Sequence, residues 1–238
     1  MQINVWTDLF FASFIPNAAA AVSAMGYAGL LVQTPLGILS NVILVPLMPI
    51  FARLAAPEHW PDLKGRIRQG VMMTAVAMLP LSALMITLAI PITRVVYERY
   101  AFTRQDADLT ASVLIAYAVG MFFYLGRDVL VRVFYGLEDA DTPFRISIFN
   151  IFLNALLDFL LVKPLCAPGL VLATVGVNIV SMAMLLWILN RRLHGLPSNN
   201  GVFRFWAWLS PVSQQAWLPG LFWVGLSRSG ALRVCCSG

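Results

Sequence analysis

Residues 146–189 read ISIFNIFLNALLDFLLVKPLCAPGLVLATVGVNIVSMAMLLWIL, and Asp158 and Lys163 are the only charged side chains among them. The stretch contains two apolar runs, Ile146–Leu165 and Gly169–Leu189, which meet at a segment rich in proline. A membrane-spanning helix needs about 20 mostly apolar residues. The two runs therefore predict two membrane helices that follow each other closely in the chain.

The composition of the whole chain agrees with a membrane location. Of its 238 residues 60% are hydrophobic and 11% are charged, and the mean hydropathy is +0.80. Soluble domains carry about 25% charged residues, so this chain has too few charges to build a water-facing surface. The net charge of +5 comes from basic residues between apolar runs, which indicates orientation in a membrane and no nucleic-acid partner. No phosphate-binding glycine loop, zinc-ligand spacing or nucleophile elbow is present in the sequence, so we do not expect an enzyme.

Four further apolar segments precede this pair of helices, which gives six in all. Prolines interrupt the second and third segments, as is tolerated where neighbouring helices satisfy the freed carbonyl groups. Several broken helices favour a transporter over a simple membrane anchor. We therefore expect an all-α membrane protein with a six-helix lobe over residues 1–194. The four segments are Ile3–Ile15, Ala21–Phe51, Val71–Ile92 and Leu109–Phe134.

The basic residues between the segments predict the orientation, because cytoplasmic loops carry an excess of Lys and Arg. One set of alternate loops holds ten of them: Arg53, Lys64, Arg66, Arg68, Arg127, Arg132, Arg145, Arg191, Arg192 and Arg204. The opposite set holds four: Arg94, Arg99, Arg104 and Lys163. The bias predicts a multi-pass protein of the bacterial cytoplasmic (inner) membrane whose N-terminus lies in the cytoplasm.

The tail over residues 195–238 differs from the rest of the chain. From Pro197 onward it contains no Asp, Glu or Lys, yet it holds Trp206, Trp208, Trp217 and Trp223. Two interpretations stay open. The tail is either an irregular interfacial segment with a belt of tryptophans or the translation of a shifted reading frame, and the second is slightly favoured.

Polar side chains within the apolar segments are candidates for function, since ionisable groups are costly at membrane depth. Asn150, Asn154 and Asp158 recur every four residues, so they share one face of a helix. Their carboxylate and amide oxygens, with the carboxylate of Asp8 and the hydroxyl of Thr174, suit a hard cation such as sodium. A carboxyl group that binds a proton is the alternative.

The competing interpretation is that these polar groups only join helices through hydrogen bonds. We expect that role for Asn150, Asn178 and Ser181. For Asp158 with Asn154 and Asp8 we favour a sodium or proton site, and we expect no other cofactor.

Three stretches resemble the MurJ/MviN family of the multidrug/oligosaccharidyl-lipid/polysaccharide exporter superfamily. Residues 27–55 read YAGLLVQTPLGILSNVILVPLMPIFARLA, residues 97–103 read YERYAFT, and residues 132–148 read RVFYGLEDADTPFRISI. The opening, MQINVWTDLFFASFIP, is similar to cyanobacterial members. The resemblance covers about residues 1–193 and implies a six-helix lobe of a MATE/MurJ-like flippase fold, equivalent to the second half of the flippase.

The resemblance also implies an activity. Members translocate lipid II, an undecaprenyl-pyrophosphate-linked peptidoglycan precursor, by alternating access between two lobes. The implied partners are this lipid, membrane lipids and a missing N-terminal lobe. An arginine expected in the central cavity falls on Leu30 here. The implied cation ligands are Asp8, Asn154, Asp158 and Thr174, with a backbone carbonyl near Leu170.

Other interpretations stay open at this stage. The chain could be an O-antigen, polysaccharide or drug exporter of the same superfamily, although the stretches over 97–103 and 132–148 argue against that. A membrane-embedded polyprenyl transferase would need acidic metal-binding motifs, and the run Glu138–Asp141 is too short for one. A non-functional truncated membrane fragment is the last alternative.

Overall fold

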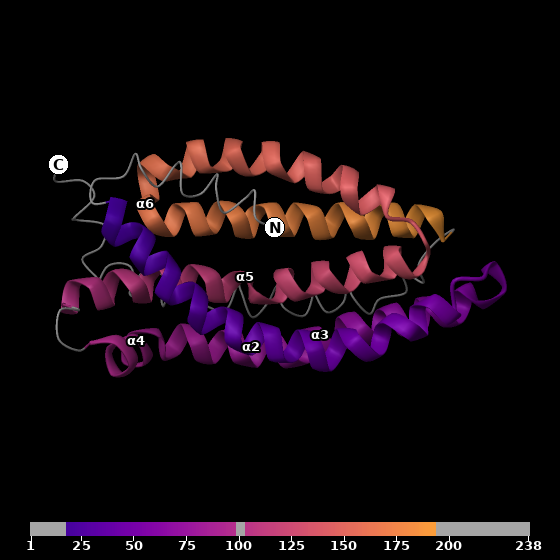
Figure 1. Cartoon of the computed structure of the whole chain (residues 1–238), viewed down its shortest axis with the longest axis horizontal. Coiled ribbons are helices and arrows are strands. Elements are labelled where there is room, and N and C mark those ends of the chain that lie inside the picture. The colour runs from indigo at the N-terminus through magenta and orange to yellow at the C-terminus, as the bar shows by residue number, and fades with distance from the viewer. Residues whose placement is uncertain (1–17, 99–102, 194–238) are drawn as a thin grey trace, which may run out of the picture.

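The computed structural model describes residues 18–98 and 103–193, and every regular element within these ranges is helical (Figure 1). In chain order the elements are α2 (Ala18–Arg53), the short 3-10 helix η1 (Pro57–His59), α3 (Trp60–Thr87), α4 (Ala89–Tyr97), α5 (Arg104–Gly136) and α6 (Asp141–Arg192). The expected first segment, Ile3–Ile15, and the tail over 195–238 lie outside the described residues.

Five stretches of the described chain are long and apolar enough to cross a membrane. They correspond to the last five segments expected from the sequence, with different ends. They are Ala18–Arg53, Pro57–Thr87, Arg104–Gly136, Asp141–Val162 and Ala167–Arg192.

The third expected segment, Val71–Ile92, differs most from the structure. Helix α3 already begins at Trp60, and it ends at Thr87, after which Leu88 separates it from α4. Pro80 lies inside α3 without ending it. Pro91 explains the break, because proline has no N–H to donate to the carbonyl of Thr87 four residues earlier.

Helix α6 folds back on itself, as Figure 1 shows. The Nδ2 of Asn150 donates a hydrogen bond of 3.1 Å to the Oγ of Ser181. In a straight helix two residues 31 positions apart would be separated by about 46 Å. The arms 141–162 and 167–192 therefore run antiparallel, as the two apolar runs of the sequence predict.

Helix α5 is the centre of the bundle. It contacts α2, α3, α4 and α6, and it is the most buried of the five spans. Its last residue, Gly136, allows α2 to approach closely, because a Cβ there would lie 2.8 Å from the Cβ of Phe51. Phe51 and Phe134 are fully buried in the apolar core.

The turns gather at two ends of the bundle (Figure 1). The α2–α3 turn, the α5–α6 turn and the C-terminal end of α6 lie at one end. The start of α2, the end of α4, the start of α5 and the fold of α6 lie at the other. The ends match the two sets of alternate loops that the sequence defines.

Candidate functional site

The first arm of α6 carries a column of buried polar side chains. Asn154 and Asp158 have no exposed surface, and Asn150 is only 4% exposed. The Nδ2 of Asn154 donates a hydrogen bond of 3.0 Å to the Oδ2 of Asp158. The predicted placement of these residues on one helix face is confirmed.

The second arm of α6 supplies polar groups at the same depth. The Asn150–Ser181 hydrogen bond and the close approach of Leu157 to Gly176 fix the antiparallel register. This register places Thr174 near the level of Asp158. The Thr174 Oγ1 donates to the carbonyl oxygen of Leu170 at 3.3 Å.

Four of the five predicted ligands thus form two contacting pairs on facing arms of the hairpin. Asp158 with Asn154 is one pair, and Thr174 with Leu170 is the other. The fifth, Asp8, lies outside the described residues. The donor set is a carboxylate, an amide, a hydroxyl and a backbone carbonyl, all of them hard oxygen ligands of the kind that sodium takes. Across residues 18–98 and 103–193 no three His, Cys, Asp or Glu side chains group as a metal site.

Ser181 links the two arms of the hairpin and helix α5, whereas the hydrogen bond of Asn178 stays within its own arm. The Nδ2 of Asn178 donates to the Thr174 carbonyl at 2.7 Å. Ser181 is fully buried and its Oγ accepts from Asn150. The contacts of Asn150 and Ser181 agree with their expected role as polar groups that join helices. The Asn178 bond to Thr174 joins residues of one helix, so the same role for Asn178 stays a prediction.

Arg127 of α5 also contacts these buried polar groups, and the sequence did not predict this contact. The charge pattern assigns it to the basic residues of one set of loops, but it lies within α5, nine residues before the helix ends at Gly136. Its Nε donates to the Ser181 Oγ at 3.1 Å, and its Nη1 lies 3.8 Å from the Asp128 Oδ1. Its position inside the apolar segment 109–134 is the signal that could have identified it.

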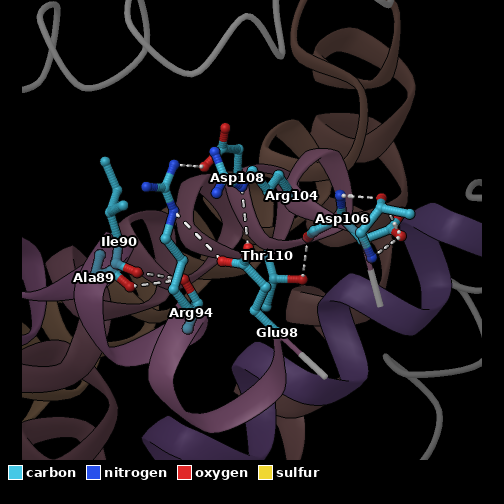
Figure 2. Close-up of polar contacts among 10 residues, drawn as sticks. Ala89, Ile90, Arg94, Glu98, Arg104, Asp106, Asp108 and Thr110 are labelled. Carbon is cyan, nitrogen blue, oxygen red and sulfur yellow. Dashed lines mark hydrogen bonds and ion pairs between the residues drawn. The ribbon is translucent and has the colours of Figure 1, made fainter. Parts of the chain in front are cut away.

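The end of α4 and the start of α5 are held together by ion pairs at one end of the bundle. Figure 2 shows Arg94 and Glu98 of the α4 end facing residues of α5. Arg94 Nη2 lies 3.0 Å from Asp108 Oδ1, and Arg104 Nε lies 3.2 Å from Glu98 Oε1. Thr103 and Asp106 form a reciprocal capping box that starts α5. These groups are partly exposed, so each ion pair contributes about 0–1 kcal/mol.

The turn over residues 137–140, at the other end, closes α5 with a Schellman motif. The N–H of Asp139 donates to the Phe134 carbonyl at 3.0 Å, and the N–H of Glu138 donates to the Tyr135 carbonyl at 3.1 Å. Glu138 adopts a φ of 58°, the left-handed conformation that this motif needs.

Asp139 joins the two ends of α6 at that turn. Its Oδ1 accepts from the N–H of Thr142 at 3.1 Å, its Oδ2 accepts from the Thr142 hydroxyl, and it pairs with Arg192. Burial alone would raise the pKa of Asp139, but the hydrogen bonds from Thr142 and the Arg192 guanidinium hold that pKa below its ordinary value.

We expect Asp139→Asn to lower the stability of the folded chain at neutral pH by about 0.5–1 kcal/mol, since the pair is partly exposed. A carboxyl group with a lowered folded pKa stabilises the fold above its unfolded pKa, and this contribution is lost as pH falls through the folded value. The difference in thermal midpoint between wild type and variant should therefore shrink as the pH falls below about 4. A difference that stays constant from pH 7 to pH 3 would contradict the charge-dependent role.

Comparisons with known proteins identify the family to which this chain belongs. A family model described as "Lipid II flippase MurJ" matches residues 1–226. The chain belongs to the lipid II flippase MurJ family. Like its relatives it is a multi-pass membrane protein, and the family is one of transporters and not one of catalytic enzymes.

Two relatives and one solved structure define the extent of the similarity. The chain is 60% identical over 196 residues to "Probable lipid II flippase MurJ" from Synechocystis sp., with 82% of this chain and 36% of the relative covered. It is 28% identical over 173 residues to the Rickettsia prowazekii protein of the same name, with 73% and 34% covered. The solved structure "Lipid II flippase MurJ, inward closed conformation" superposes with a TM-score of 0.70 at 21% identity, over 98% of this chain and 49% of that chain.

The superposition shows that the described helices adopt the fold of one part of a MurJ flippase, which confirms the expected fold class. The chain spans about a third of the length of the curated relatives that it matches.

Proposed function

We propose that this chain supplies one lobe of a flippase that moves lipid II from the inner to the outer leaflet of the bacterial cytoplasmic membrane. Membership of the MurJ family is the observation that carries the proposal. The lobe works with a second, N-terminal lobe, because alternating access needs two bodies that rock around a shared cavity. The reaction is transport without covalent chemistry, so the chain is not an enzyme.

We further propose that a sodium ion or a proton binds at Asp158 and couples to this movement. Asn154, Thr174, the Leu170 carbonyl and Asp8 complete the site. A buried carboxylate on one arm of a hairpin and a hydroxyl on the other would draw the arms together around the cation. Binding would thereby favour one arrangement of the lobe over another.

A chimeric protein tests the transport proposal. The 196-residue segment of the Synechocystis relative that this chain matches is replaced by the matching residues of this chain. We expect the chimera to restore growth to bacteria depleted of their own flippase, and the 238-residue chain alone to fail. A folded, membrane-inserted chimera that never restores growth would refute the transport proposal. Growth restored by the chain alone would refute the need for a second lobe.

We propose that the end of the bundle bearing the α2–α3 and α5–α6 turns faces the cytoplasm. It carries Arg53, Lys64 and Arg66 near the α2–α3 turn, as the positive-inside rule requires. Together with the predicted span Ile3–Ile15, this orientation supports the proposal that the N-terminus lies in the cytoplasm.

Labelling of single cysteines tests the orientation. Cys166, Cys235 and Cys236 are first replaced by serine, and a cysteine is then placed at exposed Glu58 or exposed Gln105. In intact cells a membrane-impermeant maleimide should label Gln105→Cys at once and Glu58→Cys only after permeabilisation. The reverse pattern would invert the proposed orientation.

A further inference from the structure

A groove between α2 and α3 lies apart from the polar column on α6. It consists of two adjoining hollows of about 660 Å³ and 720 Å³, which share Gly65 and Gln69 as lining residues. Helix α2 borders it from Leu39 to Arg53 with Leu54 of the following turn, and α3 borders it from Pro61 to Ala77.

The inner hollow is apolar. Its walls are formed by Leu39 and Ile43 of α2 and by Met72, Met73 and Val76 of α3. Leu39 lies 14 residues before the end of α2 at Arg53, which corresponds to about 21 Å along the helix. The groove therefore reaches from the end of the bundle into the hydrocarbon depth of one leaflet, which is about 15 Å thick.

The outer hollow carries positive charge. Arg53 and Arg66 line it with a single carboxylate, Asp62, and Arg68 lies where the apolar hollow begins. Arg66 donates to the Gln69 side chain at 3.1 Å. Within residues 18–98 and 103–193 neither Arg53 nor Arg68 forms an ion pair with a carboxylate. The mouth of the groove thus presents guanidinium groups that can bind an anion.

We propose that this groove binds one anionic phospholipid, with an acyl chain along Met72, Met73 and Val76 and the headgroup phosphate at Arg68 and Arg53. A guanidinium binds a phosphate through paired hydrogen bonds. Charge complementarity selects an anionic lipid over zwitterionic phosphatidylcholine, because the choline group of the latter already balances its phosphate and would lie beside the arginines. A basic pocket between membrane helices, open to an apolar slot, suits a lipid that carries both features. The site does not depend on the proposed transport of lipid II.

Gly65 offers a way to fill the groove without disturbing the core. It is exposed, it lines both hollows, and a Cβ added there would have nothing within 4 Å. Gly37 of α2 is a matched control, since it is also an exposed helical glycine with open space around its Cβ, and it does not line the groove. Gly65→Leu should therefore block the lipid, whereas Gly37→Leu should not.

The experiment places the full chain in nanodiscs that contain equal amounts of phosphatidylglycerol and phosphatidylcholine. Native mass spectrometry then identifies the lipids that stay bound to the chain when it is released from the nanodiscs. We expect the wild type and Gly37→Leu to retain phosphatidylglycerol preferentially. Gly65→Leu should lose the retained lipid, and Arg68→Gln should weaken the phosphatidylglycerol preference by about fivefold, the effect of one basic residue near an anionic headgroup.

Four results would overturn the proposal. One is equal retention of the two lipids by the wild type, and another is unchanged retention by Gly65→Leu. The third is a self-associated wild type that Gly65→Leu converts to a monomer, which would assign the groove to a second copy of the chain. Arg68 is exposed and lies outside the core, so Arg68→Gln tests the proposal even if Gly65→Leu fails to fold. An unchanged phosphatidylglycerol preference in Arg68→Gln would overturn it.

Discussion

We expect Asp158→Asn to abolish ion-driven transport by the chimeric flippase while the lobe stays folded. Asparagine keeps the size of the side chain, and its carbonyl oxygen can still accept the hydrogen bond that Asn154 donates to Asp158 Oδ2. The variant removes the negative charge that would balance a bound cation. Loss of one partner of a buried charge pair costs about 3–5 kcal/mol, so cation affinity should fall by about 100-fold or more.

The measurement is lipid II translocation in proteoliposomes under an imposed sodium gradient and, separately, an imposed proton gradient. The gradient that drives the wild-type chimera identifies the coupling ion. Ser82→Ala is the matched control, because Ser82 is also buried at membrane depth and donates to the Ala118 carbonyl at 2.6 Å, away from the site. It should cost about 1 kcal/mol of stability and leave transport unchanged. Wild-type transport by Asp158→Asn under both gradients would remove Asp158 from the mechanism.

The periodic features of the site could be predicted from the sequence. Asn150, Asn154 and Asp158 are spaced by four residues, and a helix converts that spacing into one face whatever surrounds it. The apolar length of each run likewise predicted the spans of α5 and of the two arms of α6. The burial of Asn154 and Asp158 follows from the same pattern, since a polar stripe on an otherwise apolar helix avoids lipid.

The contacts between distant residues could not be predicted in the same way. Ser181 accepts hydrogen bonds from Arg127 on α5 and from Asn150 on the first arm of α6, and the residues are separated by 54 and 31 positions. The pairing of Asp139 with Arg192 also depends on the hairpin that brings the two ends of α6 together. Such pairs depend on the register and depth of packed helices, and hydropathy does not encode either.

Three helix ends differ from those expected from hydropathy or lack the usual sequence signal. Pro91 lies four residues after Thr87 and marks the end of α3 by removing one helical hydrogen bond. The Schellman turn at Glu138 carries no glycine, so its usual sequence signal is absent. The assignment of Lys64, Arg66 and Arg68 to a loop failed for another reason, because α3 extends three turns beyond its apolar portion.

We expect Gly136→Val to be strongly destabilising, because Gly136 lies at the contact between α5 and α2. The Cβ of any larger residue would lie 2.8 Å from the Phe51 Cβ and 3.2 Å from the Phe51 carbonyl carbon. Neither atom is the end of a flexible side chain, so α2 and α5 must move apart along the contact that buries Phe51 and Phe134. Overpacking of a core costs about 1–3 kcal/mol and sometimes more, and valine adds two methyl groups beyond the clashing Cβ.

The measurement is the thermal midpoint of the purified chain in detergent, followed by circular dichroism and by the accessibility of a buried cysteine probe. We expect a clear fall for Gly136→Val, a smaller fall for Gly136→Ala, and none for Gly37→Ala, whose Cβ meets nothing within 4 Å. The contact between Gly136 and Phe51 joins α2 to α5, and neither residue lines the groove. Packing and lipid binding should therefore separate: Gly136→Val loses stability, whereas Gly65→Leu loses the lipid. Equal midpoints for Gly136→Val and Gly37→Ala would mean that α2 and α5 do not approach each other as closely as the fold requires.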